Sequence, residues 1–160
     1  MKRISQLFAV VTTVLLFNVT LFSQSTYKQF GNLCNNTVTV SSTWTKLNTT
    51  SGTHSFMKSD GNTKIEVYVN SRFMVGKING SGGVEFQVKV DNKMPTFGNQ
   101  GSILKSNSSE FLSIFAVFQN IPAGNHTVSL WAQAPPSGSA TSVLADPGGW
   151  GGMIIVKETQ

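Results

Sequence analysis

The order of apolar and polar residues along the chain predicts β-strands. Residues 64–70 and 84–91 alternate between apolar and polar side chains, and residues 127–133 do the same except that Trp131 interrupts the polar positions. Apolar residues at every second position line one face of a strand, whereas they would spread around a helix. Each segment therefore predicts a strand with one buried and one solvated face. Residues 37–44 are rich in β-branched side chains and predict a further strand.

Two other segments are apolar on both faces. Residues 111–118 form an apolar run broken only by Ser113, and residues 153–156 are similarly apolar. Such a strand either is central and covered on both sides, or has an outer face that meets another subunit. Clusters of Gly, Asn, Ser and Pro separate the strands at roughly the spacing of antiparallel sandwiches and barrels. We therefore predict an all-β fold of antiparallel strands.

The beginning of the chain has the order of a secretory signal peptide. Lys2 and Arg3 form a positive start, residues 7–22 are largely apolar, and small or polar residues follow at 23–25. A retained membrane anchor is the alternative, but the apolar stretch is short for a span of about 20 residues and contains an asparagine. We predict a secreted protein with no membrane span after cleavage.

This reading divides the chain into a signal peptide at 1–24, an N-terminal segment at 25–37 and one folded domain at 38–160. Removing Lys2 and Arg3 leaves ten basic against seven acidic residues, so the net charge falls from +5 to +3. The remaining basic residues are scattered rather than gathered into the patch that contacts several phosphates, and we predict no nucleic-acid binding.

The composition limits how the fold can be held together. Charged residues make up only 12% of the chain, against about a quarter in typical soluble proteins, which argues against coiled coils, helical bundles and charged disordered tails. Cys34 is the single cysteine, so the chain cannot form an intramolecular disulfide. Its thiol is either buried or bridged to another molecule. The fold must therefore depend on an apolar core.

Several short motifs, taken in order, carry a resemblance to a known family. They are Ser55-Phe56-Met57-Lys58-Ser59 with Ile65-Glu66-Val67 and Arg72-Phe73-Met74-Val75, then Phe86-Gln87-Val88-Lys89-Val90-Asp91, then Ala123-Gly124-Asn125-His126-Thr127-Val128-Ser129-Leu130-Trp131 with Gly149-Trp150 and Ile154-Ile155-Val156-Lys157-Glu158. The series resembles the C-terminal domain of collagen triple helix repeat-containing secreted proteins. Its latter part is similar to the wider C1q and tumour-necrosis-factor group. The resemblance covers roughly residues 38–158.

The resemblance implies a two-sheet jelly roll that forms a trimer and acts outside the cell by binding, without chemistry. The expected fold class is thus an antiparallel two-sheet β-sandwich of jelly-roll type, preceded by a signal peptide. Two departures matter. The chain has no collagen stalk, and it lacks the cysteines of the collagen-repeat relatives apart from Cys34, which has no evident counterpart.

Residues for catalysis or metal binding are few, and we predict no enzyme, no cofactor and no metal site. Gly80-Ser81-Gly82-Gly83 is not a nucleophile elbow, and no signature surrounds Cys34, His54 or His126. Asp60 begins a turn rather than a calcium loop. A small hydrolase remains open only if a histidine and a carboxylate converge. The carboxylates, each with a structural explanation of its own, are Asp60, Glu66, Glu85, Asp91, Glu110, Asp146 and Glu158.

The apolar and aromatic residues carry the functional prediction. We expect a homo-oligomer, the trimer that the resemblance implies, with an interface formed by Phe111, Leu112, Ile114, Phe115, Val117, Phe118 and Trp131. Its partner would be an extracellular protein or a glycan. The alternative is a monomeric carbohydrate-binding module whose ligand contacts are Trp44, Trp131 and Gln133, since an exposed indole can stack on a sugar ring. For Trp150, which is flanked by glycines, packing is favoured.

Overall fold

The structure is a computed structural model, and it consists of strands and connecting segments. It describes residues 27–31, 33, 36–47, 54–79, 82–98, 100–103, 105–135, 140–147, 149 and 151–160. Among these residues there is no helix, which confirms the prediction of an all-β fold. No described segment forms a helix able to cross a bilayer. The predicted signal peptide, Cys34 and Trp150 lie outside the described residues.

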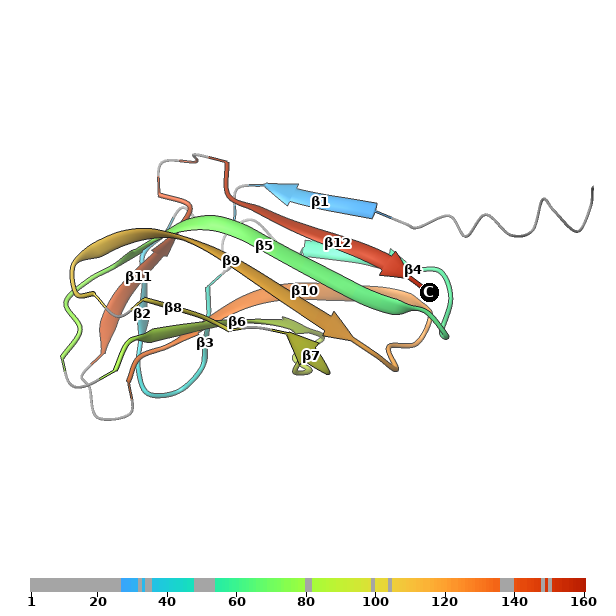
Figure 1. The fold of residues 1–160 in the computed structure, drawn as a ribbon, viewed down its shortest axis with the longest axis horizontal. Helices are drawn as coiled ribbons and strands as arrows, with labels where there is room; N and C mark the ends of the chain where they lie inside the picture. Colours follow the sequence, from blue (N-terminus) through green and yellow to red (C-terminus); the bar gives the residue numbers. More distant parts are fainter. Residues whose placement is uncertain are drawn as a thin grey trace, which may run out of the picture.

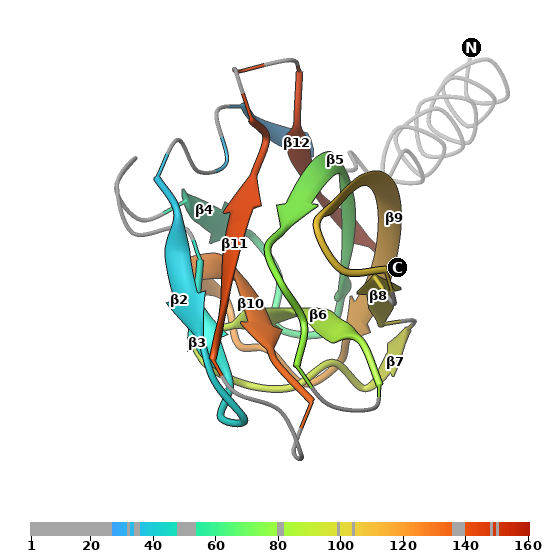
Figure 2. The ribbon, with the colours of Figure 1, turned by 90° about the vertical axis from the view of Figure 1, so that its left-hand side faces the viewer.

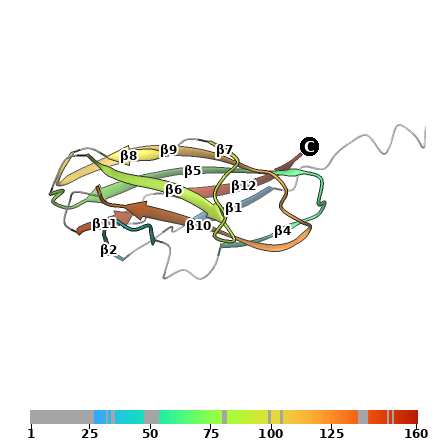
Figure 3. The same cartoon turned by 90° about the horizontal axis from the view of Figure 1, so that it is seen from below.

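The strands form two antiparallel sheets, and the predicted antiparallel β-sandwich is confirmed. The larger, sheet A, contains β1 (Tyr27–Gly31), β2 (Val38–Val40), β5 (Lys64–Val75), β7 (Phe97–Gly98), β9 (Ser108–Phe118), β11 (Thr141–Ala145) and β12 (Met153–Thr159). The smaller, sheet B, contains β3 (Thr45–Lys46), β4 (His54–Lys58), β6 (Val84–Val90), β8 (Gly101–Ile103) and β10 (Gly124–Gln133). Figure 2 shows β5 and β9 in one layer and β6 and β10 in the other, and Figure 3 shows these four strands running along the same long axis.

The long strand β5 organises sheet A. Strand β9 pairs with it along its whole length, from Ile65 opposite Phe118 to Val75 opposite Ser108. On the other side of β5, β12 pairs with its first half and β11 with its last residues (Figure 1). Strand β1 adds to the edge of β12. Residues Tyr27–Gly31 therefore belong to the sandwich, although the sequence analysis placed them in a segment ahead of the domain.

The core lies between the two sheets and is filled by the apolar side chains that occupy every second position of the alternating strands. In β5 every second residue from Ile65 to Val75 is buried. In β10, Val128 and Leu130 point inward in the same way. The Phe73 and Phe86 rings meet across the two sheets, with their centroids 4.6 Å apart. Close packing of this kind supplies the stability that disulfides provide in many small secreted domains.

Candidate functional site: the outer face of sheet A

Apolar side chains cross the outer face of sheet A, on the side away from the core. Ile155 of β12 lies opposite Tyr68 of β5, which lies opposite Phe115 of β9. The Tyr68 and Phe115 rings are 4.8 Å apart between centroids. Tyr68 is 41% exposed although Ile155 and Phe115 flank it on the two neighbouring strands. Directly opposed side chains on one face of a sheet stabilise one another, so these three residues form a continuous apolar row.

The row extends into a larger surface, which we call the apolar face. Its other members are exposed or half-buried side chains on neighbouring positions of the same side. Phe97 of β7 is 61% exposed and Phe111 of β9 is 70% exposed. A depression of about 370 Å³ lies between β5, β9 and β12. The apolar face consists of Tyr68, Phe97, Phe111, Phe115, Val117, Met153 and Ile155.

The structure divides the predicted interface residues among three places. Phe111, Phe115 and Val117 lie on the apolar face. Ile114 and Phe118 are buried in the core of the same chain, and Leu112 packs against that core. Trp131 lies on sheet B. Residues 111–118 are thus apolar on both faces because one face packs into the core and the other points outward. Phe111, Phe115 and Val117 share the outward face, and the other predicted interface residues, which are Leu112, Ile114, Phe118 and Trp131, cannot belong to the same surface.

Sequence reasoning missed the other half of the apolar face. Tyr68 lies at a position of an alternating strand where the pattern places polar residues. Phe97 lies in a strand of two residues, which is too short to show an alternating pattern. The apolar run at residues 153–156 was a usable signal, because Met153 and Ile155 supply its outward side chains. Which residues they meet depends on the pairing of β12 with β5, and local sequence does not encode that pairing.

Charged and hydroxyl groups border the apolar face at one end. Glu66 lies opposite both Lys157 and Val117 in the ladder. Its carboxylate accepts hydrogen bonds from the Tyr68 hydroxyl at 3.0 Å and from the Thr159 hydroxyl at 3.3 Å. Desolvation and the interaction with Glu66 raise the pKa of Tyr68, so its hydroxyl is neutral at physiological pH. Polar groups thus border this end of the apolar face, and Asn70 and Ser113 lie within it, beside the depression.

The predicted ligand contacts are gathered on the outer side of sheet B. The Lys89 ammonium lies 4.1 Å from the centroid of the Trp131 ring and 5.9 Å from that of Trp44. The Trp131 indole N–H donates to the Ser129 hydroxyl at 2.8 Å. The Gln133 amide donates to the Ser42 carbonyl at 2.6 Å. Trp44 and Trp131 are thus close together, but a lysine covers the ring that a sugar would use.

One histidine does meet a carboxylate, which is the condition under which a small hydrolase remained open. His126 is buried, and its Nδ1 lies 2.5 Å from the Asp91 carboxylate while its Nε2 lies 2.9 Å from the Pro122 carbonyl. Because both ring nitrogens face acceptors, this imidazole has no free position from which to activate a nucleophile. His54 is buried against Phe30, and burial lowers its pKa. No group of three or more potential metal ligands occurs among the described residues.

One buried carboxylate fastens the last strand to the β4–β5 turn. Glu158 accepts hydrogen bonds from the backbone N–H groups of Ser59 and Asp60, both at 2.9 Å, and from the hydroxyls of Ser59 and Thr63. The buried Lys58 ammonium lies 4.0 Å away. Although desolvation opposes ionisation, the hydrogen bonds from Thr63 and Ser59 lower the pKa of Glu158 to about 2. Its role is to hold β12 in register.

No protein-family model matches the chain, and no curated protein matches it.

Proposed function

We propose that the chain is a secreted, non-enzymatic recognition domain, C1q-like in its mode of action, that assembles into a homotrimer and binds an extracellular protein or surface partner. The observation that supports this proposal is the apolar face. A soluble chain with few charges gains stability by covering such a surface, since each square ångström of apolar area removed from water contributes about 25 cal/mol. An uncovered apolar sheet face would instead promote aggregation.

A second copy of the chain fits the shape of this face. The depression beside Tyr68 and Phe115 lies on the same side of the sheet as the exposed Phe97 and Phe111 rings. A surface that offers both a hollow and projecting rings can be complementary to itself under rotational symmetry. Strand spacing and rise give it about 15 by 20 Å, or roughly 300 Å². The largest apolar patch on a typical monomer has about this size and is often functional.

Assembly would give the recognition function its strength. Three copies of a weak site on one rigid body bind a multivalent surface more tightly than one copy, without any new contact. The sites would lie outside the apolar face, because that face is covered in the assembly. The proposal therefore separates the surface that holds the subunits together from the surfaces that meet the partner.

A pair of charge substitutions tests the proposal. Phe115→Glu places a carboxylate in the middle of the apolar face, whereas Met57→Glu places one on β4, where Met57 is 63% exposed and belongs to sheet B. We expect the Met57 variant to remain a trimer and the Phe115 variant to elute and scatter light as a monomer, with far-ultraviolet circular dichroism unchanged. An unaltered mass for Phe115→Glu would refute this assembly surface.

The second candidate function is carbohydrate binding through the aromatic side chains of sheet B. The observation that favours it is the proximity of Trp44 and Trp131 to the same ammonium group. A sugar ring that stacks on Trp131 must first displace Lys89. Glycan-array binding that disappears in Trp131→Ala, in a protein that stays monomeric, would favour this function over assembly.

A further inference from the structure

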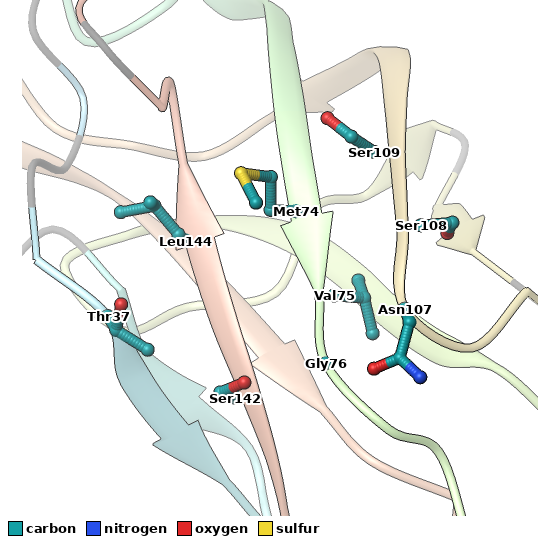
Figure 4. Close-up of a pocket in the computed structure, with 9 residues that line it drawn as sticks. All are labelled: Thr37, Met74, Val75, Gly76, Asn107, Ser108, Ser109, Ser142 and Leu144. Carbon is teal, nitrogen blue, oxygen red and sulfur yellow. The ribbon is translucent and has the colours of Figure 1, made fainter.

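A second hollow lies on the outer side of sheet A, where β5, β9 and β11 meet (Figure 4). It has a volume of about 300 Å³, near the lower end of the range for small-molecule sites. Hydroxyl and amide side chains surround it, and none of its described lining residues is ionisable. The polar lining residues are Thr37, Asn107, Ser108, Ser109 and Ser142.

Two apolar side chains line the same pocket. Met74 of β5 and Leu144 of β11 are directly opposed in the ladder and both point outward. Met74 is 45% exposed, so its thioether is available to a ligand. The pocket thus offers an apolar surface and a ring of neutral hydrogen-bonding groups. A pyranose ring has the matching chemistry, with C–H bonds on its faces and hydroxyls at its edge.

A hydrogen bond within the pocket orients one of its hydroxyls. Arg72 Nε donates to Ser109 Oγ at 2.7 Å, so the Ser109 proton can be donated to a ligand. Ser108, the preceding residue of β9, lies on the opposite side of the strand (Figure 4), and its Oγ donates to the Lys105 carbonyl at 2.6 Å. The donor at Ser109 suits a sugar hydroxyl, which can accept as well as donate.

The backbone around the pocket is held in place by hydrogen bonds between three chain segments. The Gly76 N–H donates to the Ser142 carbonyl at 2.8 Å, and the Asn107 N–H donates to the Gly76 carbonyl at 3.0 Å. A Cβ at position 76 would meet Ser142 Oγ, so a larger residue here would turn that hydroxyl away from its present position. Asn107 adopts a φ of 50°, in the left-handed region. The pocket is therefore formed before any ligand arrives.

We propose that this pocket binds a neutral pyranose sugar. None of the described lining residues is ionisable, which favours a neutral ligand, and the glucuronide in the titration below tests whether Arg72, which donates to Ser109, attracts an anion instead. The paired Met74 and Leu144 favour a ligand with an apolar face. A hexose has about 12 heavy atoms, so a single site is expected to bind with a Kd of about 1 mM. The pocket borders the proposed assembly surface, because Ser109 is two residues from Phe111 along β9, or about 7 Å. The titration below is therefore also carried out on Phe115→Glu, so that sugar binding is measured with and without assembly.

The experiment is a titration of the isotopically labelled, processed chain with methyl α-D-glucoside, galactoside and mannoside, followed by amide chemical shifts. We expect saturable shifts in residues 74–76, 107–109 and 142–144 with at least one glycoside. The corresponding methyl glucuronide is expected to bind no more tightly than the neutral sugar. Tighter binding of the glucuronide, or no saturable shift with any of the glycosides, would overturn the proposal.

Variants connect the binding to the pocket. Ser109→Ala should weaken binding by about five- to tenfold, the effect of losing one neutral hydrogen bond. Ser142→Val leaves no buried group unpaired and places methyl groups where a hydroxyl lined the pocket, so it should weaken binding without disturbing the fold. Ser102→Ala, at an exposed position of β8, is the matched control. Equal affinities for all three variants would place the sugar elsewhere and contradict the assignment.

Discussion

Replacing Glu158 by glutamine should destabilise the fold by about 3 kcal/mol at neutral pH. The carboxylate accepts a backbone N–H on each of its two oxygens, from Ser59 and from Asp60. A glutamine amide therefore turns its NH₂ group toward one backbone donor in either orientation. The substitution also leaves Lys58, which is buried, without its counter-charge. The loss of a hydrogen bond to a charged group and a buried donor left without an acceptor each cost a few kcal/mol.

The pH dependence gives the same prediction an independent magnitude. The pKa of Glu158 falls from 4.5 to about 2 on folding. A carboxyl with a lowered pKa stabilises the fold fully above its unfolded-state value, and this contribution is lost as the pH falls toward the folded-state value. At 1.36 kcal/mol per pKa unit the full contribution is about 3 kcal/mol, and roughly 2 kcal/mol of it disappears between pH 7 and pH 3.

Urea denaturation followed by tryptophan fluorescence measures both effects. The protein concentration is kept fixed, because the proposed assembly would make stability depend on it. The expected difference between wild type and Glu158→Gln is about 3 kcal/mol at pH 7 and about 1 kcal/mol at pH 3. Glu85→Gln removes an exposed carboxylate from β6 and serves as the control, with a change below about 0.5 kcal/mol. A Glu158→Gln variant as stable as wild type at pH 7, or a difference that does not narrow at pH 3, would show that this carboxylate does not hold β12.

Two further substitutions test the packing. Phe73→Ala removes a fully buried ring that contacts Phe86, and we expect it to lower the free energy of unfolding by about 3–5 kcal/mol in the same urea assay; a loss below about 1 kcal/mol would contradict the core described above. Gly98→Ala places a Cβ against the Phe115 carbonyl, at a residue whose φ is 147°. We therefore expect β7 to detach from β9, which should speed amide hydrogen exchange at Val117 and lower the free energy of unfolding by about 1–3 kcal/mol. Unchanged exchange at Val117 would show that β7 tolerates the side chain.

The alternating segments were predictable because a strand with one buried face leaves a period of two in the sequence. Residues 64–70 and 84–90 both form strands. Gln87 is an exception, because it lies at a polar position of the alternating pattern and is nevertheless buried. The edge strand β1 was not predicted, because Tyr27–Gly31 has no alternation and pairs with a strand more than a hundred residues away. Local sequence carries no record of such a partner.

The candidate site was predictable only in part for the same reason. The sequence indicated that the outer side of residues 111–118 is apolar, and Phe111, Phe115 and Val117 do point outward. It could not show that Tyr68 and Ile155 complete the row, because that follows from long-range pairing of β9, β5 and β12. Nor could it show that Lys89 covers Trp131, since their approach requires β6 and β10 to lie side by side.

The central claim is that copies of the chain cover one another's apolar face, and the mass of the processed protein in solution tests it most directly. Sedimentation equilibrium at micromolar concentration should give three times the subunit mass, with no change in the fitted mass when the salt concentration is raised, because an apolar contact is not screened by ions. A single species at the mass of one subunit, soluble and stable over the same concentrations, would contradict the account.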